Sequence, residues 1–142
     1  MEYSIKPKSL GERRIIHYPQ KRIIGLYVKF MERHIIKDAV FTKHPTQEGV
    51  FMKHFFSSQE NDRLNNLEVR IIPNFMITPH VHENSSEFFY VVDGEGEFLD
   101  NEEWKKIEKG DAFMAPQGMQ HAIKNCGKSD LVLFSTFSPA TK

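Results

Sequence analysis

Apolar and polar residues alternate along much of the chain after residue 49, a pattern typical of half-buried β-strands. The alternation is clearest in residues 50–56 and 66–72, where Val50 and Met52 share one face, as do Leu67 and Val69. Shorter segments of the same kind follow at regular intervals, at residues 87–92, 96–99, 104–107, 112–115, 120–124 and 131–137. Short strands at such spacing predict an all-β sandwich or barrel.

Glycine-containing turns separate these segments. Asp93-Gly94, Lys109-Gly110 and Gln117-Gly118 each lie between two predicted strands. No repeat, low-complexity tract or Gly/Ser linker marks a second domain. We therefore expect one barrel domain at residues 50–142 and an N-terminal extension at residues 1–49. The extension is interpreted as strands, although apolar residues at helical spacing leave open a short amphipathic helix over residues 26–36.

Composition agrees with this class and narrows the function. The chain has 142 residues, with 12 Phe and 4 Tyr, and aromatic side chains favour strands. The 19 Lys and Arg balance 19 Asp and Glu, so the basic excess of nucleic-acid-binding proteins is absent. The single Cys126, the lack of a secretory signal and the lack of a long apolar run favour a cytoplasmic protein that does not enter a membrane.

Charge is distributed unevenly along the chain. Lys and Arg outnumber Asp and Glu from Met1 to Lys43, and the reverse holds from His44 onward. Both regions can be solvated faces of one domain. Alternatively, the basic segment docks on an acidic surface, and we predict a homodimer in which it contributes a strand or clasp to the barrel of a second copy.

Candidate metal ligands lie in the segment from Pro79 to Phe98. On a strand, side chains two residues apart point to the same side, so His80 and His82 form a chelating pair. The polar Asn84-Ser85-Ser86 supplies a turn that redirects the chain before Glu87. Glu83 is the competing carboxylate, but as the neighbour of His82 it should face away, which leaves Glu87 as the better ligand.

A fourth candidate ligand, His121, begins the strand that follows the Pro116 and Gly118 turn. Three neutral imidazoles and one carboxylate suit a divalent transition-metal ion, namely Fe, Mn, Ni, Cu, Co or Zn, and do not suit Ca or Mg, which prefer oxygen ligands. Four protein ligands leave two positions of a six-coordinate ion for water or a substrate. One metal ion is therefore the expected cofactor, and a small molecule the expected partner.

These two segments resemble the motifs of the cupin superfamily. The first motif runs G, five residues, H-x-H, three or four residues, E, six residues, G, and the second runs G, five residues, P-x-G, two residues, H, three residues, N. The matching residues are His80, His82, Glu87 and Gly94 in the first motif and Gly110, Pro116, Gly118, His121 and Asn125 in the second. Asn74 replaces the opening Gly, but Asn also tolerates the left-handed backbone conformation.

The resemblance implies an antiparallel double-stranded β-helix, or jelly-roll barrel, with a metal ion inside one end. It also implies a function, because the superfamily includes metal-dependent dioxygenases, isomerases, epimerases, lyases and decarboxylases. We expect such an enzyme acting on a small molecule. The alternative is a non-catalytic binding or sensing module, which the same scaffold also supports.

Several other residues have more than one interpretation. Alternation from Glu87 and His121 sends Phe89, Val91 and Ile123 toward the barrel interior, where they either line the cavity or form ordinary core. His54 is either a surface residue or an acid–base group near the metal. The sequence does not identify a catalytic residue.

Overall fold

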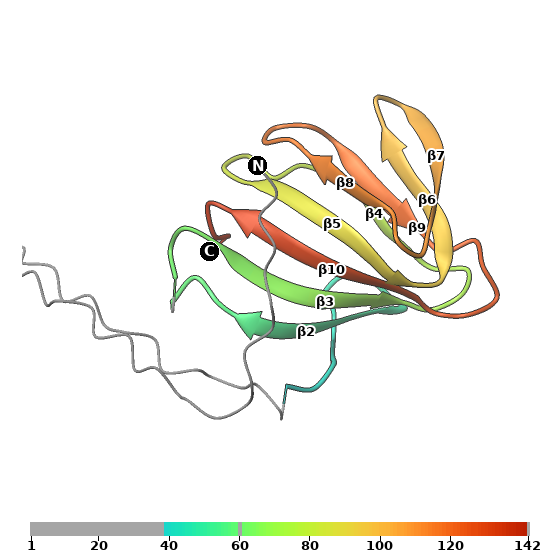
Figure 1. Ribbon diagram of the computed structural model, residues 1–142, viewed down its shortest axis with the longest axis horizontal. Helices are drawn as coiled ribbons and strands as arrows, with labels where there is room; N and C mark the ends of the chain where they lie inside the picture. Colours follow the sequence, from blue (N-terminus) through green and yellow to red (C-terminus); the bar gives the residue numbers. More distant parts are fainter. Residues whose placement is uncertain (1–38, 60, 142) are drawn as a thin grey trace, which may run out of the picture. The chain divides into compact units, whose positions relative to one another are not determined.

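A computed structural model describes residues 39–59 and 61–141, and the regular elements in these ranges are β-strands (Figure 1). The strands run in the order β1 (Thr42–Lys43), β2 (Val50–Phe56), β3 (Asn65–Ile71), β4 (Met76–His80), β5 (Ser86–Asp93), β6 (Glu95–Asp100), β7 (Glu103–Glu108), β8 (Ala112–Ala115), β9 (His121–Lys124) and β10 (Leu131–Ser138). The predicted all-β class is confirmed, and the predicted strands agree with β2, β3 and β5 to β10 within two residues at each end.

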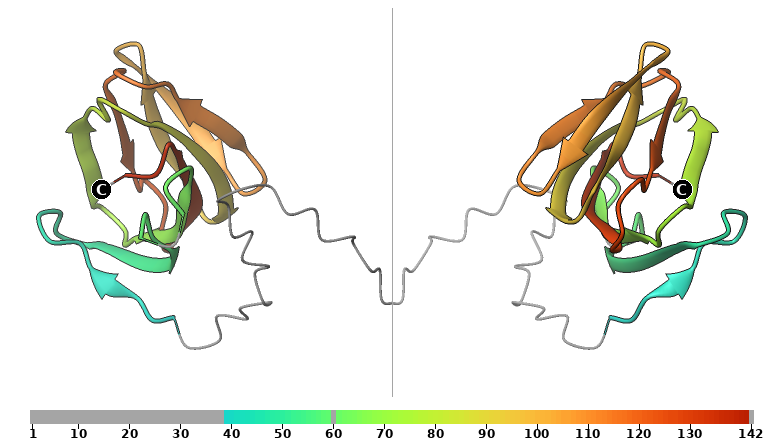
Figure 2. Two further views of the ribbon diagram at one scale, coloured as in Figure 1. Left: turned by 90° about the vertical axis from the view of Figure 1, so that its left-hand side faces the viewer. Right: turned by 90° about the vertical axis from the view of Figure 1, so that its right-hand side faces the viewer.

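Two antiparallel sheets form the barrel. One has the strand order β1-β2-β3-β10-β5-β8 and the other β4-β9-β6-β7. Consecutive strands such as β9 and β10 lie in different sheets, as in a jelly roll, and end-on views show the two sheets curving around a common centre (Figure 2). The buried cluster between them combines side chains from both sheets, including Leu133 of the larger sheet and Ile123 of the smaller one.

Strict alternation positions this core. In β3 every second residue is buried and its neighbours are half-buried, and β10 follows the same pattern. Phe89, Val91 and Ile123, which the sequence left as cavity or core residues, are at most 1% exposed and belong to the core cluster. The polar side chains at inward positions include Glu87 in β5 and Ser135 in β10. These two residues become important at the candidate site.

The turn residues of the motifs have conformations that explain their identity. Asn74 has φ of 69°, so the left-handed turn expected at this position is kept without glycine. Gly94 has φ of 85°, and a Cβ atom at this position would lie 2.4 Å from the carbonyl oxygen of Asp130. Both backbone conformation and close approach therefore require glycine at Gly94.

The structure differs from the sequence-based expectation around β4. The strand ends at His80, so His82 lies in the segment beyond it rather than on the same strand. β4 is an edge strand of its sheet and carries Pro79, which is tolerated there because an edge position does not require every backbone N–H. His54 is exposed beside a register shift in β2 and is not one of the clustered residues, which agrees with its interpretation as a surface residue.

Part of the N-terminal extension is described. β1 pairs with β2 through Thr42 and Met52, whereas the choice between strand and helix at residues 26–36 concerns residues outside the described ranges. The clasp expected from the segment before Lys43 lies mostly outside them as well, and the domain boundary after residue 49 stays a prediction. Within residues 39–59 and 61–141, no helix has the length and apolar character needed to cross a membrane.

Candidate metal centre

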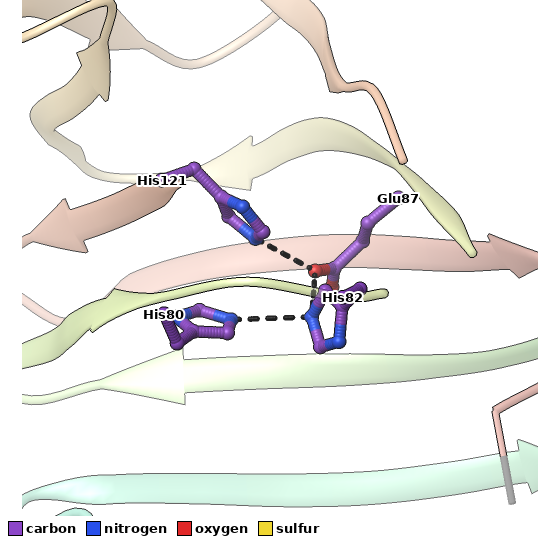
Figure 3. Close-up of side chains that lie close together, drawn as sticks. All are labelled: His80, His82, Glu87 and His121. Carbon is purple, nitrogen blue, oxygen red and sulfur yellow. Dashed lines mark hydrogen bonds and ion pairs between the residues drawn. The ribbon is translucent and has the colours of Figure 1, made fainter. Parts of the chain in front are cut away.

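Three histidines and one glutamate converge between the two sheets (Figure 3). One potential ligand atom from each of His80, His82, Glu87 and His121 lies within 4.8 Å of all the others. His80 and His121 are direct cross-strand partners on β4 and β9, while Glu87 reaches them from β5 in the opposite sheet. The four residues proposed as ligands from the sequence thus lie together, whereas Glu83 is exposed and outside the cluster.

Backbone carbonyls orient two of the imidazole rings. Nδ1 of His80 lies 2.9 Å from the carbonyl oxygen of Thr78, and Nδ1 of His121 lies 3.1 Å from that of Met119. A carbonyl oxygen can only accept, so Nδ1 carries the proton in both rings. Their Nε2 atoms therefore present lone pairs to the interior, which is the arrangement of a metal-binding histidine whose other nitrogen is held by the backbone.

Glu87 lies at the centre of the cluster. Its Oε2 atom is 3.1 Å from Nε2 of His82 and 3.3 Å from Nε2 of His121, while its Oε1 atom accepts a hydrogen bond from the Ser135 hydroxyl. Burial opposes ionisation of Glu87. Without a metal ion, a proton held between Oε2 and His121 or His82, together with the hydrogen bond from Ser135, favours the ionised carboxylate more than burial opposes it, so the pKa of the Glu87 carboxyl lies below its ordinary value.

The charge state of His80 also suits metal binding. Burial lowers the pKa of His80 below its ordinary value, although the hydrogen bond to Thr78 opposes this effect. The neighbouring His121 and His82 lower it further because like charges repel. A neutral imidazole beside an ionised carboxylate is the protonation state in which these groups ligate a metal ion.

Loop contacts hold His82, which lies outside the strands. The Gly118 amide donates to the carbonyl oxygen of His82 at 3.0 Å, and the Gln117 side chain donates to that of Glu83 at 2.8 Å. The backbone N–H of Gln117 also donates to the Ser86 hydroxyl. The loop of the second motif therefore fixes the loop of the first. Sequence reasoning identified Gln117, Gly118 and Ser86 as turn residues but not the contacts between the two loops, because side chain to backbone contacts across 31 and 34 residues leave no periodic signal.

Asn125, the last residue of the second motif, is structural. It is 2% exposed, and its Nδ2 atom donates to the carbonyl oxygens of Ile71 and Ser129, both at 2.8 Å. Its Oδ1 atom accepts from the Gly127 amide at 2.9 Å. Asn125 thus fastens the loop after β9 to β3 and does not contact the histidines.

The donor set fits a transition-metal ion. Three imidazoles with one carboxylate are borderline ligands that suit first-row divalent ions, whereas Ca and Mg prefer sites built mainly from oxygen atoms. The side chains of Glu87 and His121 are 6% and 2% exposed, and that of His82 is 24% exposed. The site is therefore closed by the core on one side and reachable from solvent past His82.

Aromatic rings form the wall around the cluster. Phe137 lies edge-on to His82 at 4.9 Å between ring centroids, and Phe89 and Phe98 lie 6.1 and 6.4 Å from His121. Phe113 stacks on Phe89 at 5.0 Å. This apolar wall reduces water access from the core side, which strengthens electrostatic interactions at the cluster.

Comparison with known proteins gives sequence relatives of this fold. The family model described as Cupin domain matches residues 67–137, which is half of the chain. A Thermotoga maritima protein named oxalate-binding protein is 35% identical over 63 residues, or 44% of this chain and 52% of that protein. The chain therefore spans about half the length of this curated relative.

Solved structures agree with the family match. A protein described as a predicted oxalate decarboxylase from Thermotoga maritima superposes with a TM-score of 0.66 at 26% identity, over 72% of this chain and 94% of that one. KdgF from a Halomonas species superposes with a TM-score of 0.67 at 25% identity, over 76% and 93%. The family match, together with the barrel described above, shows that the chain belongs to the cupin superfamily.

Proposed function

We propose that His80, His82, Glu87 and His121 bind one divalent transition-metal ion. The observation that carries this proposal is the convergence of lone pairs. In the neutral ring, Nε2 of His121 carries no proton when Nδ1 donates to Met119, yet it lies 3.3 Å from a carboxylate oxygen of Glu87. Two acceptors at this distance repel each other unless a cation or a proton lies between them. A metal ion satisfies all four side chains together.

We further propose that the chain is a metal-dependent enzyme for a small molecule, of the dioxygenase, isomerase or lyase type. A bound ion of this kind polarises an oxygen of its ligand or activates dioxygen. The four side chains would hold the ion, and Phe137 and the other aromatic rings would limit water around it. The oxalate-binding relative and the solved structure described as a predicted oxalate decarboxylase make a small carboxylate such as oxalate the first candidate substrate.

One observation favours the alternative, a binding module without catalysis. Among the described residues, the ionisable side chains that shift the pKa of His80 and Glu87 all belong to the cluster itself. Within the cluster, every ionisable side chain is itself a candidate ligand, so none is left over to act as a separate acid or base. An enzyme of this design would depend on the metal ion and its ligands for proton transfer, whereas a binding module needs no such group.

Elemental analysis tests metal binding. After incubation with Fe, Mn, Ni or Zn and removal of excess ion, the wild-type protein should carry close to one ion per chain. His121→Ala should lose most of it, because one strong ligand is missing. The exposed His54 is the matched control, since His54→Ala removes an imidazole outside the cluster and should leave the metal content unchanged. A wild-type protein that stays metal-free would contradict the proposal.

Two measurements on the loaded protein separate the enzyme from the binding module. Nitric oxide, added to the Fe(II) protein without oxygen, should give a new absorption band and a paramagnetic signal if positions on the ion are open. Its absence would indicate a closed structural site. Oxalate and other small carboxylates are then screened for binding and for product formation. Binding without product across the screen would favour the non-catalytic module.

A further inference from the structure

Ser135 interrupts an otherwise apolar row in the core. The inward positions of β10 are Leu131, Leu133, Ser135 and Phe137, and Ser135 is 0% exposed. A hydroxyl buried among apolar side chains costs free energy unless it forms a hydrogen bond. Any small apolar residue would fit the alternation, so the hydroxyl at this position calls for a reason beyond packing.

The reason is the contact between Ser135 and Glu87. The Ser135 hydroxyl donates to Oε1 of Glu87, and both side chains are buried. Strand pairing fixes the two residues, because Phe137 pairs with Glu87 and Ser135 pairs with Phe89, so Ser135 is the diagonal neighbour of Glu87 on the same face. A serine side chain has one rotatable bond before its oxygen, and the donor is therefore held firmly by the sheet.

We propose that Ser135 is a positioning residue that occupies Oε1 of Glu87, so that the carboxylate presents only Oε2 to the imidazoles. This inference rests on the proposed metal site. The two carboxylate oxygens already have separate roles, since Oε2 contacts His82 and His121 while Oε1 contacts Ser135. Among the described residues, the Ser135 hydroxyl is the hydrogen-bond donor to Oε1, and Ser135 is not one of the candidate ligands.

The consequence concerns the number of open positions. A carboxylate that ligates through one oxygen uses one position of a six-coordinate ion and, with three imidazoles, leaves two. A carboxylate that ligates through both oxygens leaves one. By holding Oε1, Ser135 keeps space for a ligand that chelates through two atoms, such as oxalate, and removing the hydroxyl releases Oε1 toward the ion.

Three variants test the role of the hydroxyl. Ser135→Ala removes it, Ser135→Thr retains it, and Thr136→Ala removes a hydroxyl from the next residue of β10, which faces the other side of the sheet. Loss of a contact that orients a metal ligand typically weakens metal affinity by about 10- to 100-fold. We expect a loss of this size in Ser135→Ala, recovery in Ser135→Thr and no change in Thr136→Ala, measured by competition with a chelator.

A spectroscopic measurement separates positioning from packing. The absorption spectrum of the Co(II)-loaded protein reports the ligand set, and it should differ between Ser135→Ala and wild type but not between Ser135→Thr and wild type. Affinity for oxalate, which chelates, should fall more in Ser135→Ala than affinity for azide, which binds through one atom. Should Ser135→Ala not fold without metal, the variant refolded in the presence of Co(II) is measured instead, and the same change of the spectrum and the same greater loss of affinity for oxalate than for azide are expected.

Several outcomes would overturn the inference. Unchanged metal affinity and an unchanged Co(II) spectrum in Ser135→Ala would show that the hydroxyl does not position Glu87. Equal losses in Ser135→Ala and Ser135→Thr would assign the effect to packing. If the wild-type protein itself binds no metal, the proposed function fails and this inference fails with it. A wild-type protein that binds metal with the same affinity as Ser135→Ala refutes only the positioning role.

Discussion

Replacing Asn125 with alanine should destabilise the barrel without emptying the metal site. The side chain makes three hydrogen bonds to backbone groups of Ile71, Ser129 and Gly127. Its removal leaves two carbonyl oxygens and one amide without these partners, and a buried unsatisfied group costs about 1–3 kcal/mol. The Ile71 carbonyl belongs to a fully buried residue, whereas Ser129 is exposed and Gly127 half-buried, so water can replace part of the loss there. We expect the free energy of unfolding to fall by about 2–4 kcal/mol in total.

Asn66 provides a matched control for this substitution. Its Oδ1 atom is buried without a hydrogen-bond partner among the described residues, so Asn66→Ala should cost little or even stabilise the protein. Urea unfolding of the metal-free proteins gives both free energies, and elemental analysis gives the metal content. If the free energies of unfolding of Asn125→Ala and Asn66→Ala lie within about 0.5 kcal/mol of each other, Asn125 does not stabilise the barrel through its hydrogen bonds to buried backbone groups. Loss of metal from a folded Asn125→Ala protein would likewise refute its separation from the site.

Two further predictions concern pH and assembly. The metal-free protein should lose stability as pH falls through 6.5, because His80 has a lowered pKa when folded. The unfolded chain then binds a proton at His80 that the folded protein does not bind. Glu87, whose pKa is also lowered on folding, adds a second loss of stability as pH falls below 4.5. Thermal melting between pH 8 and 3 should show both steps, and Glu87→Gln should weaken the second. The homodimer expected from the sequence stays a prediction. Its interface should include the outer face of β5 and β8, where Phe88, Tyr90 and Met114 are 43%, 43% and 56% exposed. Together these side chains present roughly 300 Å² of largely apolar surface. Tyr90→Lys should then shift sedimentation toward the monomer, and unchanged sedimentation would exclude this face.

Periodicity made most of the fold predictable. β2 and β8 agree with the predicted segments at both ends, and in β3 and β10 the alternation of apolar and polar residues coincides with burial of one face. β4 was not predicted as a strand of its own, because its sequence MITPH includes Pro79 and its residues are exposed or half-buried without alternation. An edge strand with few side chains in the core leaves little signal in the sequence, since its position depends on pairing with β9.

The candidate ligands were also accessible from the sequence, but for a different reason. His80, His82, Glu87 and His121 occupy motif positions whose spacing reflects the geometry of one site. Spacing predicted that they meet, although the assumed reason was incomplete, since His82 lies beyond the end of β4 and is held by the amide of Gly118. The motif spacing therefore predicts which residues meet at the site but does not show which contacts hold them there.

Ser135 shows where sequence reasoning could have gone further. The segment that contains it was predicted as a strand, yet the polar residue at an inward position of that strand was not questioned. A buried hydroxyl needs a partner, and the partner must come from an adjacent strand or from the facing sheet. Because Glu87 is the other polar inward residue predicted nearby, alternation in the two strands identifies both members of the pair. What the sequence lacks is the register that makes Phe137 the partner of Glu87, and this register decides which carboxylate oxygen the hydroxyl reaches. The chemistry of the site thus depends on a strand pairing that joins residues 48 positions apart.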